Sequence, residues 1–275
     1  MLLILEVNLR DVALLTGVGV KSRRPNESNE DPLRKEIWKM RQNRSDLTPR
    51  TVRIETGVIP GIESSVLYHA GNTTILCVAK LEEGTPRWLN GPSGWATAEY
   101  HMAPYSVTPR LERQGGGDGR TLEIRRLISR AIRGGLDLGL MPGYTLRVDC
   151  DVLHADGGTR TASINAATVA IGLVIESQLA SGVLAADPRR DQVLAVSSGI
   201  VDGRILVDLE YSEDSKADVD LNLVGTLKGD LIEIAGGCEG LAIPMDTLNE
   251  VLGAARQGLD QLAEELTPYL RAVAD

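Results

Sequence analysis

Phenylalanine is absent from this chain of 275 residues, so aliphatic side chains have to supply most of the core. Cysteine is also scarce. Cys77, Cys150 and Cys238 are odd in number and far apart, and each lies in an apolar alternating stretch. We therefore expect small core side chains rather than a disulfide framework or a metal site, and a reducing cytoplasm as the compartment.

Long apolar runs and the common nucleotide-binding motifs are missing as well. The N-terminal runs LLILEV and VALLTGVGV are broken by charged residues, so we expect neither a signal peptide nor a membrane span, and no membrane partner. Neither a P-loop Lys-Ser/Thr pair nor a G-x-G-x-x-G spacing occurs, which argues against an ordinary nucleotide-binding fold. His69, His101 and His154 lack metal-ligand spacing, and we expect structural or surface roles for them.

Positive charge is in the minority, and the net charge of −9 by itself argues against nucleic-acid binding. The charges are, however, separated along the chain. From Val107 to Arg133 there are seven arginines and three acids, whereas residues 205–275 carry fifteen acids and four basic residues. A protein with a basic face that binds a polyanion and a separate acidic face would show this separation of charge. The ordinary alternative is that the charged residues lie on helix faces that are exposed to solvent.

The composition, with 43% hydrophobic and 24% charged residues, is typical of one or two globular domains. Residues 1–45 show no clean periodicity, and the part from Lys21 to Arg44 is rich in charged residues, Asn, Ser and Pro. We predict a poorly ordered extension over residues 1–45 and a folded domain over residues 46–275. Met40 is a candidate internal start of translation.

Hydrophobic patterns after residue 50 predict an α+β protein, a mixed α/β sandwich. Gly84 to Pro109 looks irregular, and a loop of that length is usually functional or mobile. Alternation predicts three antiparallel strands, a central strand, a hairpin across Asp202-Gly203 and a further strand pair, at residues 51–58, 64–71, 73–83, 144–154, 192–201, 204–211, 219–227 and 231–235. Spacing of three to four predicts helices at residues 121–133, 159–184 and from 245 to about 274.

The stretch VDCDVLHADGGTRTAS joins the central strand to the second helix through Gly157-Gly158. Such a turn directs backbone N–H groups and the positive end of a helix dipole at one point, where an anion is favoured. Thr159 and Ser163 can add hydroxyl donors, and Arg160 adds a planar charged fork suited to phosphate. The alternative is that the glycines only turn the chain and Thr159 only caps the helix.

A second candidate anion-binding element is the glycine-rich stretch QGGGDG, which ends at Arg120. Thr121 is predicted to cap the following helix, whose polar face presents Arg126, Arg130 and Arg133. A glycine loop that brings Arg120 to a helix N-terminus would bind an anion. The alternative is a plain loop followed by a solvated basic helix.

The acidic stretch DLEYSEDSKADVDLN, from Asp208 to Asn222, supplies carboxylates on two strand-like segments and on the connection between them. Hard cations such as Mg²⁺ prefer oxygen ligands of this kind and keep waters and substrate phosphates as further ligands. Most acidic runs are solvated turns. Together with two anion-binding elements, however, the acids indicate phosphoryl chemistry, with arginines for the charge and a metal or carboxylic acid for the leaving oxygen.

Five strings of the sequence resemble the RNase PH family, which comprises phosphate-dependent 3′-to-5′ exoribonucleases related to polynucleotide phosphorylase and exosome ring subunits. They are GWATAEYHMAP, DGRTLEIRRLISRAIR, VDCDVLHADGGTRTASI, SSGIVDG and DLEYSEDSKADVDLN, and the similarity runs from about Arg41 to the C-terminal helix. The resemblance implies the α/β fold shared with the second domain of ribosomal protein S5, a ring-shaped homohexamer, RNA as partner, and Mg²⁺ with inorganic phosphate as co-substrate.

The resemblance also assigns roles to individual residues. Asp214 and Asp220 correspond to the family's paired aspartates, which are associated with Mg²⁺ and with protonation of the leaving 3′ oxygen. Phosphate binding is expected from Arg120, Gly158, Thr159 and Arg160, and RNA binding from Arg110, Arg113 and Arg126.

The chain also departs from the family pattern. Tyr105 stands where the family commonly has an arginine, the arginine-bearing loop is shorter and less basic, and RQNRSDLTPR replaces the N-terminal basic motif. Since each neutralised phosphate adds to affinity, fewer cations predict a weaker and less salt-dependent grip on RNA.

Three functions therefore remain open. The first is an active phosphorolytic exoribonuclease that trims RNA 3′ ends, with tRNA precursors as the family's usual substrate. The second is a ring or scaffold subunit without RNA turnover, against which the intact phosphate-binding and acidic residues argue. The third is a phosphorolytic enzyme restricted to short oligonucleotides, which the reduced basic loop suggests.

Overall fold

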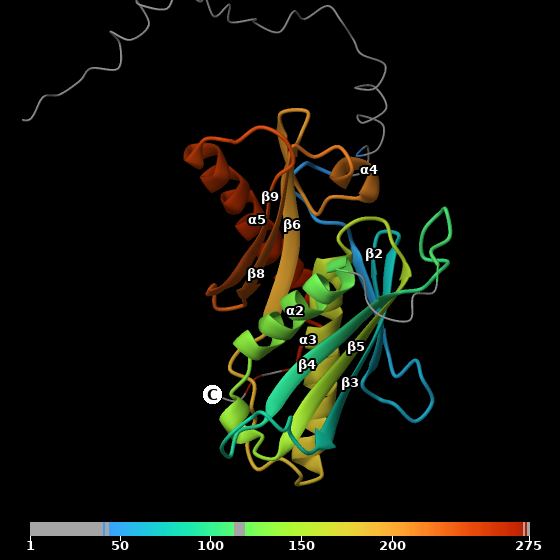
Figure 1. Ribbon diagram of the computed structural model, residues 1–275, viewed down its shortest axis with the longest axis vertical. Helices are drawn as coiled ribbons and strands as arrows, with labels where there is room; N and C mark the ends of the chain where they lie inside the picture. Colours follow the sequence, from blue (N-terminus) through green and yellow to red (C-terminus); the bar gives the residue numbers. More distant parts are fainter. Residues whose placement is uncertain (1–40, 42–43, 113–118, 272, 274–275) are drawn as a thin grey trace, which may run out of the picture. The chain divides into compact units, whose positions relative to one another are not determined.

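A computed structural model describes residues 41, 44–112, 119–271 and 273 of the chain. These residues form two β-sheets, with two helices between the sheets and a third helix on the outer face of the second sheet (Figure 1). The extension predicted over residues 1–45 lies almost wholly outside the described residues. Arg41 and Arg44 lie within them, and Arg41 is buried, so they are part of the folded body.

The first sheet has five strands in the order β1-β2-β3-β5-β4. Its first three strands form the antiparallel meander that the sequence predicts, and the alternating central strand occupies its predicted bounds. The strands are β1 (Val52–Thr56), β2 (Ser65–Ala70), β3 (Thr73–Glu83), β4 (Trp95–Met102) and β5 (Tyr144–His154).

The prediction of an irregular segment from Gly84 to Pro109 is wrong in its middle, where β4 runs parallel to β5. Ala96, Ala98 and Tyr100 are buried and alternate with more exposed residues. Small alanines at the buried positions give a weak hydrophobic signal, and the parallel partner lies more than forty residues away in the sequence. Only the tertiary pairing makes the strand evident.

The second sheet has four strands in the order β7-β6-β8-β9, and its neighbours are antiparallel. The predicted hairpin between β6 and β7 is confirmed, with φ of 50° at Asp202 and 73° at Gly203, as a two-residue hairpin turn requires. The strands are β6 (Val193–Val201), β7 (Arg204–Val207), β8 (Val219–Thr226) and β9 (Leu231–Cys238).

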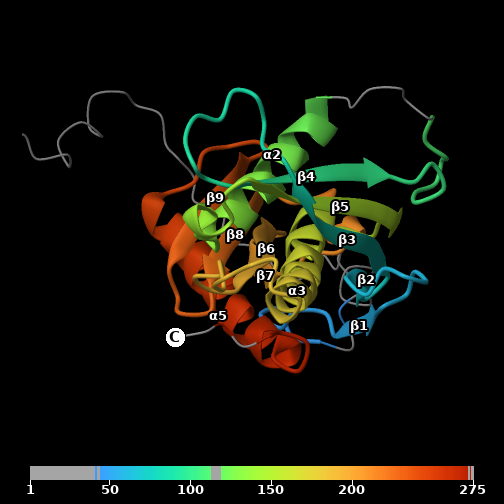
Figure 2. The same cartoon turned by 90° about the horizontal axis from the view of Figure 1, so that it is seen from below.

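Two helices, α2 (Gly119–Gly134) and α3 (Thr159–Ala180), lie between the two sheets (Figure 2). α3 contacts strands of both sheets, which explains why it is apolar on all sides. Among the described helices, α3 is the one with the length and hydropathy of a membrane span, but 72% of its most apolar window is buried within the protein.

The remaining helices are α5 (Met245–Leu266), the short α4 (Tyr211–Asp214) and a 3₁₀ turn at Leu138–Leu140. α5 packs on the face of the second sheet that points away from α3, where the Ser198 hydroxyl donates to the Val251 carbonyl at 3.3 Å. The predicted starts of α3 and α5 are confirmed, but α2 begins at Gly119, so Thr121 lies inside its first turn instead of capping it.

The cysteine prediction is confirmed for two residues and wrong for the third. Cys77 and Cys150 are buried on paired strands, with their Sγ atoms 3.8 Å apart. Cys238, at the end of the edge strand β9, is exposed. Its alternating neighbours indicated a core position, but Cys238 is the last residue of an edge strand, whose outer side pairs with no further strand among the described residues.

Candidate active site

The N-termini of α2 and α3 meet β8 and α4 around one cleft with a volume of about 300 Å³. Sheet alternation brings β8 residues into it, since Asp220 and Asn222 share one face of the strand. Six predicted site residues line this cleft although they lie in four separate segments of the sequence: Arg120, Gly158, Thr159, Arg160, Asp214 and Asp220.

The glycine turn before α3 requires glycine at both positions. Gly157 and Gly158 have φ of 73° and 63°, in the left-handed region that favours glycine. A Cβ on Gly157 would stand 2.4 Å from the Leu209 carbonyl oxygen. Gly158 is the N-cap and no side chain caps the helix, so the first N–H groups of α3 are left for water or an anion.

The hydroxyls predicted to help bind an anion differ in their placement. Thr159 lies in the cleft, and its Oγ1 is 2.9 Å from the phenol oxygen of the buried Tyr100, so it does not cap the helix. Ser163 is fully buried and does not line the cleft, so its predicted role as a donor is wrong. Ser163 lies on the same face of α3 as Thr159 but one turn farther from the N-terminus, where the core surrounds its side chain.

Two arginines approach the cleft from different helices. Arg120 lies in the first turn of α2, and Arg160 in the first turn of α3. The guanidinium group of Arg160 donates to Glu123 at 3.1 Å and lies 4.0 Å from the Asp220 carboxylate. Arg160 therefore holds a fixed orientation between α2 and β8, as recognition of an anion requires.

Two aspartates face these arginines. Burial raises the pKa of Asp214, while the charges of Arg120 and Arg160 oppose the rise. Burial and the neighbouring charge of Asp214 raise the pKa of Asp220 to about 6, again against the two arginines. A carboxyl group with that pKa exchanges its proton near neutral pH, which is the property of a general acid or base.

The acidic pair also has the chemistry of a Mg²⁺ site. The described residues contain no cluster of three or more His, Cys, Asp or Glu side chains that could hold a metal alone. Mg²⁺, however, is commonly bound by one or two carboxylates, with waters and substrate phosphates completing its shell. Asp214 and Asp220, with the amide of Asn222 in the same cleft, fit that donor set.

The predicted RNA-binding arginines do not lie together. Arg110 is exposed in the segment after β4, directly before Leu111, which lines the cleft. Arg126 is exposed in a separate hollow of α2, which it shares with Arg130 and Arg133. Arg113 lies outside the described residues. The structure thus places one of the three beside the cleft.

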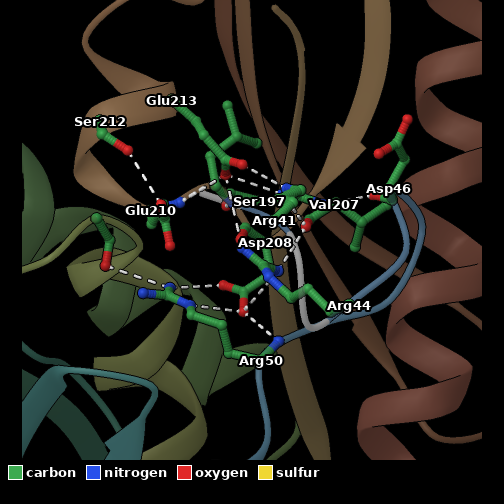
Figure 3. Close-up of polar contacts among 12 residues, drawn as sticks. Arg41, Arg44, Asp46, Arg50, Ser197, Val207, Asp208, Glu210, Ser212 and Glu213 are labelled. Carbon is green, nitrogen blue, oxygen red and sulfur yellow. Dashed lines mark hydrogen bonds and ion pairs between the residues drawn. The ribbon is translucent and has the colours of Figure 1, made fainter. Parts of the chain in front are cut away.

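Arg41, Arg44 and Arg50, the arginines of the altered N-terminal motif, are not an RNA-binding surface. Figure 3 shows Arg41, Arg44 and Arg50 directed at two carboxylates, those of Asp208, which follows β7, and of Glu213 in α4. Arg41 is 8% exposed and Arg50 is 7% exposed. Buried, ion-paired arginines cannot contact a phosphate backbone, so these three residues do not bind RNA, and the predicted weaker binding of RNA stays a prediction.

Sequence reasoning missed several residues that line the cleft, among them Tyr211 and Asn222. Tyr211, the first residue of α4, is 64% exposed and lines the cleft. Asn222 faces the cleft from β8. Both lie inside the acidic stretch, whose carboxylates alone were considered as site residues. The signal for Tyr211 was an aromatic side chain in a stretch that is otherwise charged and polar, which indicates a binding role.

Comparisons with known proteins agree with this geometry. The sequence model of the 3′ exoribonuclease family matches with domain 1 at residues 48–174 and with domain 2 at residues 191–258. Ribonuclease PH of Syntrophomonas wolfei subsp. wolfei is 45% identical over 225 residues, which cover 80% of this chain and 94% of that protein.

Solved structures of exosome proteins are similar in fold. Rice (Oryza sativa) Rrp46 has a TM-score of 0.66 at 16% identity, covering 82% of this chain and 98% of that one. A chain of the Archaeoglobus fulgidus exosome, with RNA bound to the active site, has a TM-score of 0.70 at 24% identity, covering 84% and 95%. The predicted fold class is confirmed by these similarities.

Proposed function

Since the chain belongs to the RNase PH family of phosphorolytic 3′ exoribonucleases, we propose that its cleft removes single nucleotides from RNA 3′ ends with inorganic phosphate. One observation carries the proposal. Two helix N-termini, each with an arginine, open into the same cleft as a pair of half-buried aspartates. Positive groups for an anion thus lie beside a carboxyl group that exchanges its proton near pH 6.

The positive side of the cleft would hold the phosphate nucleophile. Phosphate is an anion and attacks a phosphorus atom that is itself surrounded by negative oxygens, so fixed positive groups must bring the two together. We assign this role to Arg120, to Arg160 and to the backbone of Gly158 and Thr159. A phosphate oxygen bonds to the phosphorus of the last internucleotide linkage, whose bond to the 3′ oxygen breaks. A nucleoside diphosphate leaves.

The acidic side would serve the departing oxygen. The RNA 3′ oxygen leaves with a negative charge and needs a proton, which the protonated form of Asp220 can donate. Asp214 raises the pKa of Asp220 by its charge and so keeps that proton available. Mg²⁺ held by these two carboxylates would be the alternative to the proton, because a carboxylate that ligates a metal is deprotonated; the ion would then supply the positive charge to the departing oxygen.

RNA would reach the cleft past Tyr211 and Arg110. An exposed aromatic ring beside a phosphate site is suited to stacking on an unpaired base, and an exposed arginine to a backbone phosphate. Such contacts read no sequence, so they fit single-stranded 3′ ends in general. We propose precursor tRNA 3′ ends, in the cytoplasm, as the natural substrate class.

We also propose that the chain assembles into a ring, as a homohexamer. Exposed apolar side chains occur on β9, in the segment that follows it and at the start of α5, at Leu231, Ile234, Leu241 and Met245. Apolar surface of this kind on an edge strand is typical of a subunit contact. Light scattering tests the assembly: a hexameric mass agrees with the proposal, and a monomeric mass contradicts it.

The activity is tested with purified protein, Mg²⁺, phosphate and a labelled RNA with a single-stranded 3′ end. Stepwise shortening that needs phosphate and releases nucleoside diphosphates supports the proposal. No turnover of any RNA would indicate a scaffold subunit, and turnover of short oligonucleotides alone would indicate a restricted substrate range. Asp218→Asn, outside the residues that line the cleft, is the control for Asp220→Asn.

A further inference from the structure

We propose that Arg50 is a positioning residue that holds the glycine turn before α3 and the segment leading to α4 in one fixed arrangement. The inference rests on the proposed function, because the turn is assigned to phosphate binding and α4 carries Asp214. Arg50 itself lies outside the cleft residues and is 7% exposed. It would act through the two halves of the site rather than on the substrate.

One side of the Arg50 guanidinium binds the glycine turn. Its Nη1 donates to the Asp156 carbonyl at 2.7 Å, and its Nη2 donates to the Gly157 carbonyl at 3.4 Å. Nη2 would also be only 2.8 Å from a Cβ on Gly158, so the side chain lies against the turn that begins α3. Thr73 joins this group, because its hydroxyl donates to the Gly157 carbonyl at 2.7 Å.

The other side of the same guanidinium binds Asp208 (Figure 3). Nε donates to Oδ2 at 2.9 Å and Nη2 to Oδ1 at 2.7 Å, and the Arg50 backbone N–H also donates to Oδ2 at 2.7 Å. Burial alone would raise the pKa of Asp208, but the attraction of Arg50 holds it below its ordinary value. Asp208 thus remains a carboxylate throughout the neutral range.

Asp208 is the residue from which the α4 segment starts. It has φ of 55°, which a residue other than glycine adopts only when its surroundings enforce it. Leu209 and Glu210 follow, and Glu210 forms a capping box with Glu213 at the start of α4. Since α4 has four residues, it cannot hold its own position, and the contacts of Asp208 and Glu213 must fix where Asp214 lies.

The two halves also touch each other directly. The backbone N–H of Tyr211 donates to the Asp156 carboxylate at 3.4 Å, while the Asp156 carbonyl accepts from Arg50. The Leu209 carbonyl stands against Gly157. Arg50 therefore links the glycine turn to the α4 segment, so that a small shift of one segment moves the other. Only a planar group with several N–H donors can hydrogen-bond to both segments at once.

A matched control exists at the far end of the molecule. Arg189 is also buried, and it makes a two-pronged ion pair with Asp187 and donates to the Arg271 carbonyl at 3.4 Å. It bridges to Leu136, just beyond the C-terminus of α2, so the helix length of about 24 Å separates it from Arg120. Arg189→Lys thus tests the loss of a buried guanidinium without touching the cleft.

The experiment compares Arg50→Lys, Asp208→Asn and Arg189→Lys with the wild-type protein. Lysine keeps the charge of Arg50 but cannot reach both halves, and asparagine tolerates the backbone of Asp208 while it removes the charge. We expect Arg50→Lys to raise KM for phosphate and to lower kcat, with kcat/KM reduced roughly 100-fold. Asp208→Asn should act in the same direction. Arg189→Lys should lower Tm and leave kcat and KM unchanged.

Hydrogen exchange gives a second readout that needs no turnover. In Arg50→Lys the backbone amides of residues 157–160 and 208–214 should lose protection together, and in Arg189→Lys neither segment should change. A folded Arg50→Lys variant with wild-type kcat and KM, or loss of protection in one segment alone, would overturn the inference. If the wild-type protein itself shows no phosphorolysis, the proposed function fails, and calorimetric binding of inorganic phosphate to the same variants still tests the positioning role.

Discussion

The sharpest prediction concerns Asp220→Asn, which should inactivate the protein and at the same time stabilise it at neutral pH. Asp220 is only 23% exposed in its side chain, and its pKa is raised from 3.8 to about 6. At about 1.4 kcal/mol per unit of pKa, this rise means that ionised Asp220 destabilises the folded state by about 3 kcal/mol. Asparagine resembles the protonated carboxyl group and avoids that cost.

The sign follows from linkage. Because the pKa of Asp220 is higher in the folded than in the unfolded state, the folded protein binds its proton more tightly between those two values. The stability contributed by this group is present at low pH, is lost as the pH rises to about 6, and stays lost above that. The variant lacks this step. Its advantage in free energy of unfolding should therefore grow from near pH 4 to above pH 6 and then remain constant.

Urea unfolding of both proteins across this pH range measures the difference directly. Titrating groups that do not interact with Asp220 cancel in the comparison, since both proteins share them. Phosphorolysis, measured alongside, should be lost in the variant, because asparagine cannot give a proton to the leaving oxygen. An Asn variant that is less stable than wild type at pH 8, or whose advantage does not change with pH, would refute the reasoning, as would retained turnover.

Three further predictions follow from other contacts. Arg120→Ala should abolish phosphorolysis while leaving Tm and the assembled mass unchanged, which calorimetry and light scattering check. Gly157→Ala should cost more stability than Gly182→Ala by at least about 2 kcal/mol in urea unfolding, since both have positive φ but only Gly157 would clash with the backbone. Arg41→Met should lower the free energy of unfolding by about 3 kcal/mol because it leaves Glu213 buried without its nearest partner. If Gly157→Ala or Arg41→Met were as stable as the wild-type protein, the clash or the ion pair inferred at that residue would be contradicted.

Much of the site could be predicted from local sequence. A strand that alternates over eleven residues, two glycines and an apolar helix predict the turn that presents the N-terminus of α3, and both its bounds and its position are confirmed. The acidic stretch likewise predicts carboxylates at a strand start. That these elements share one cleft came from the family resemblance, since local patterns do not say which distant segments meet.

The errors have a common physical cause, because each depends on contacts between segments far apart in the sequence. β4 was missed because its buried positions are alanines and its partner is parallel. Arg41 and Arg44 looked like surface cations because arginine usually is one, and only the carboxylates from residues 208–213 make their burial possible. Ser163 was expected in the site because it lies one turn from Thr159 on the same face of α3, but there distant segments of the core cover it.

The central claim is that the cleft holds free phosphate beside an RNA 3′ end and transfers the terminal nucleotide to it. Incubation of the protein with unlabelled RNA and radiolabelled inorganic phosphate tests this most directly. The account predicts that the label appears in the β-phosphate of the released nucleoside diphosphates, and that Arg160→Ala releases none. Release of unlabelled nucleoside monophosphates, or turnover that does not need phosphate, would contradict it.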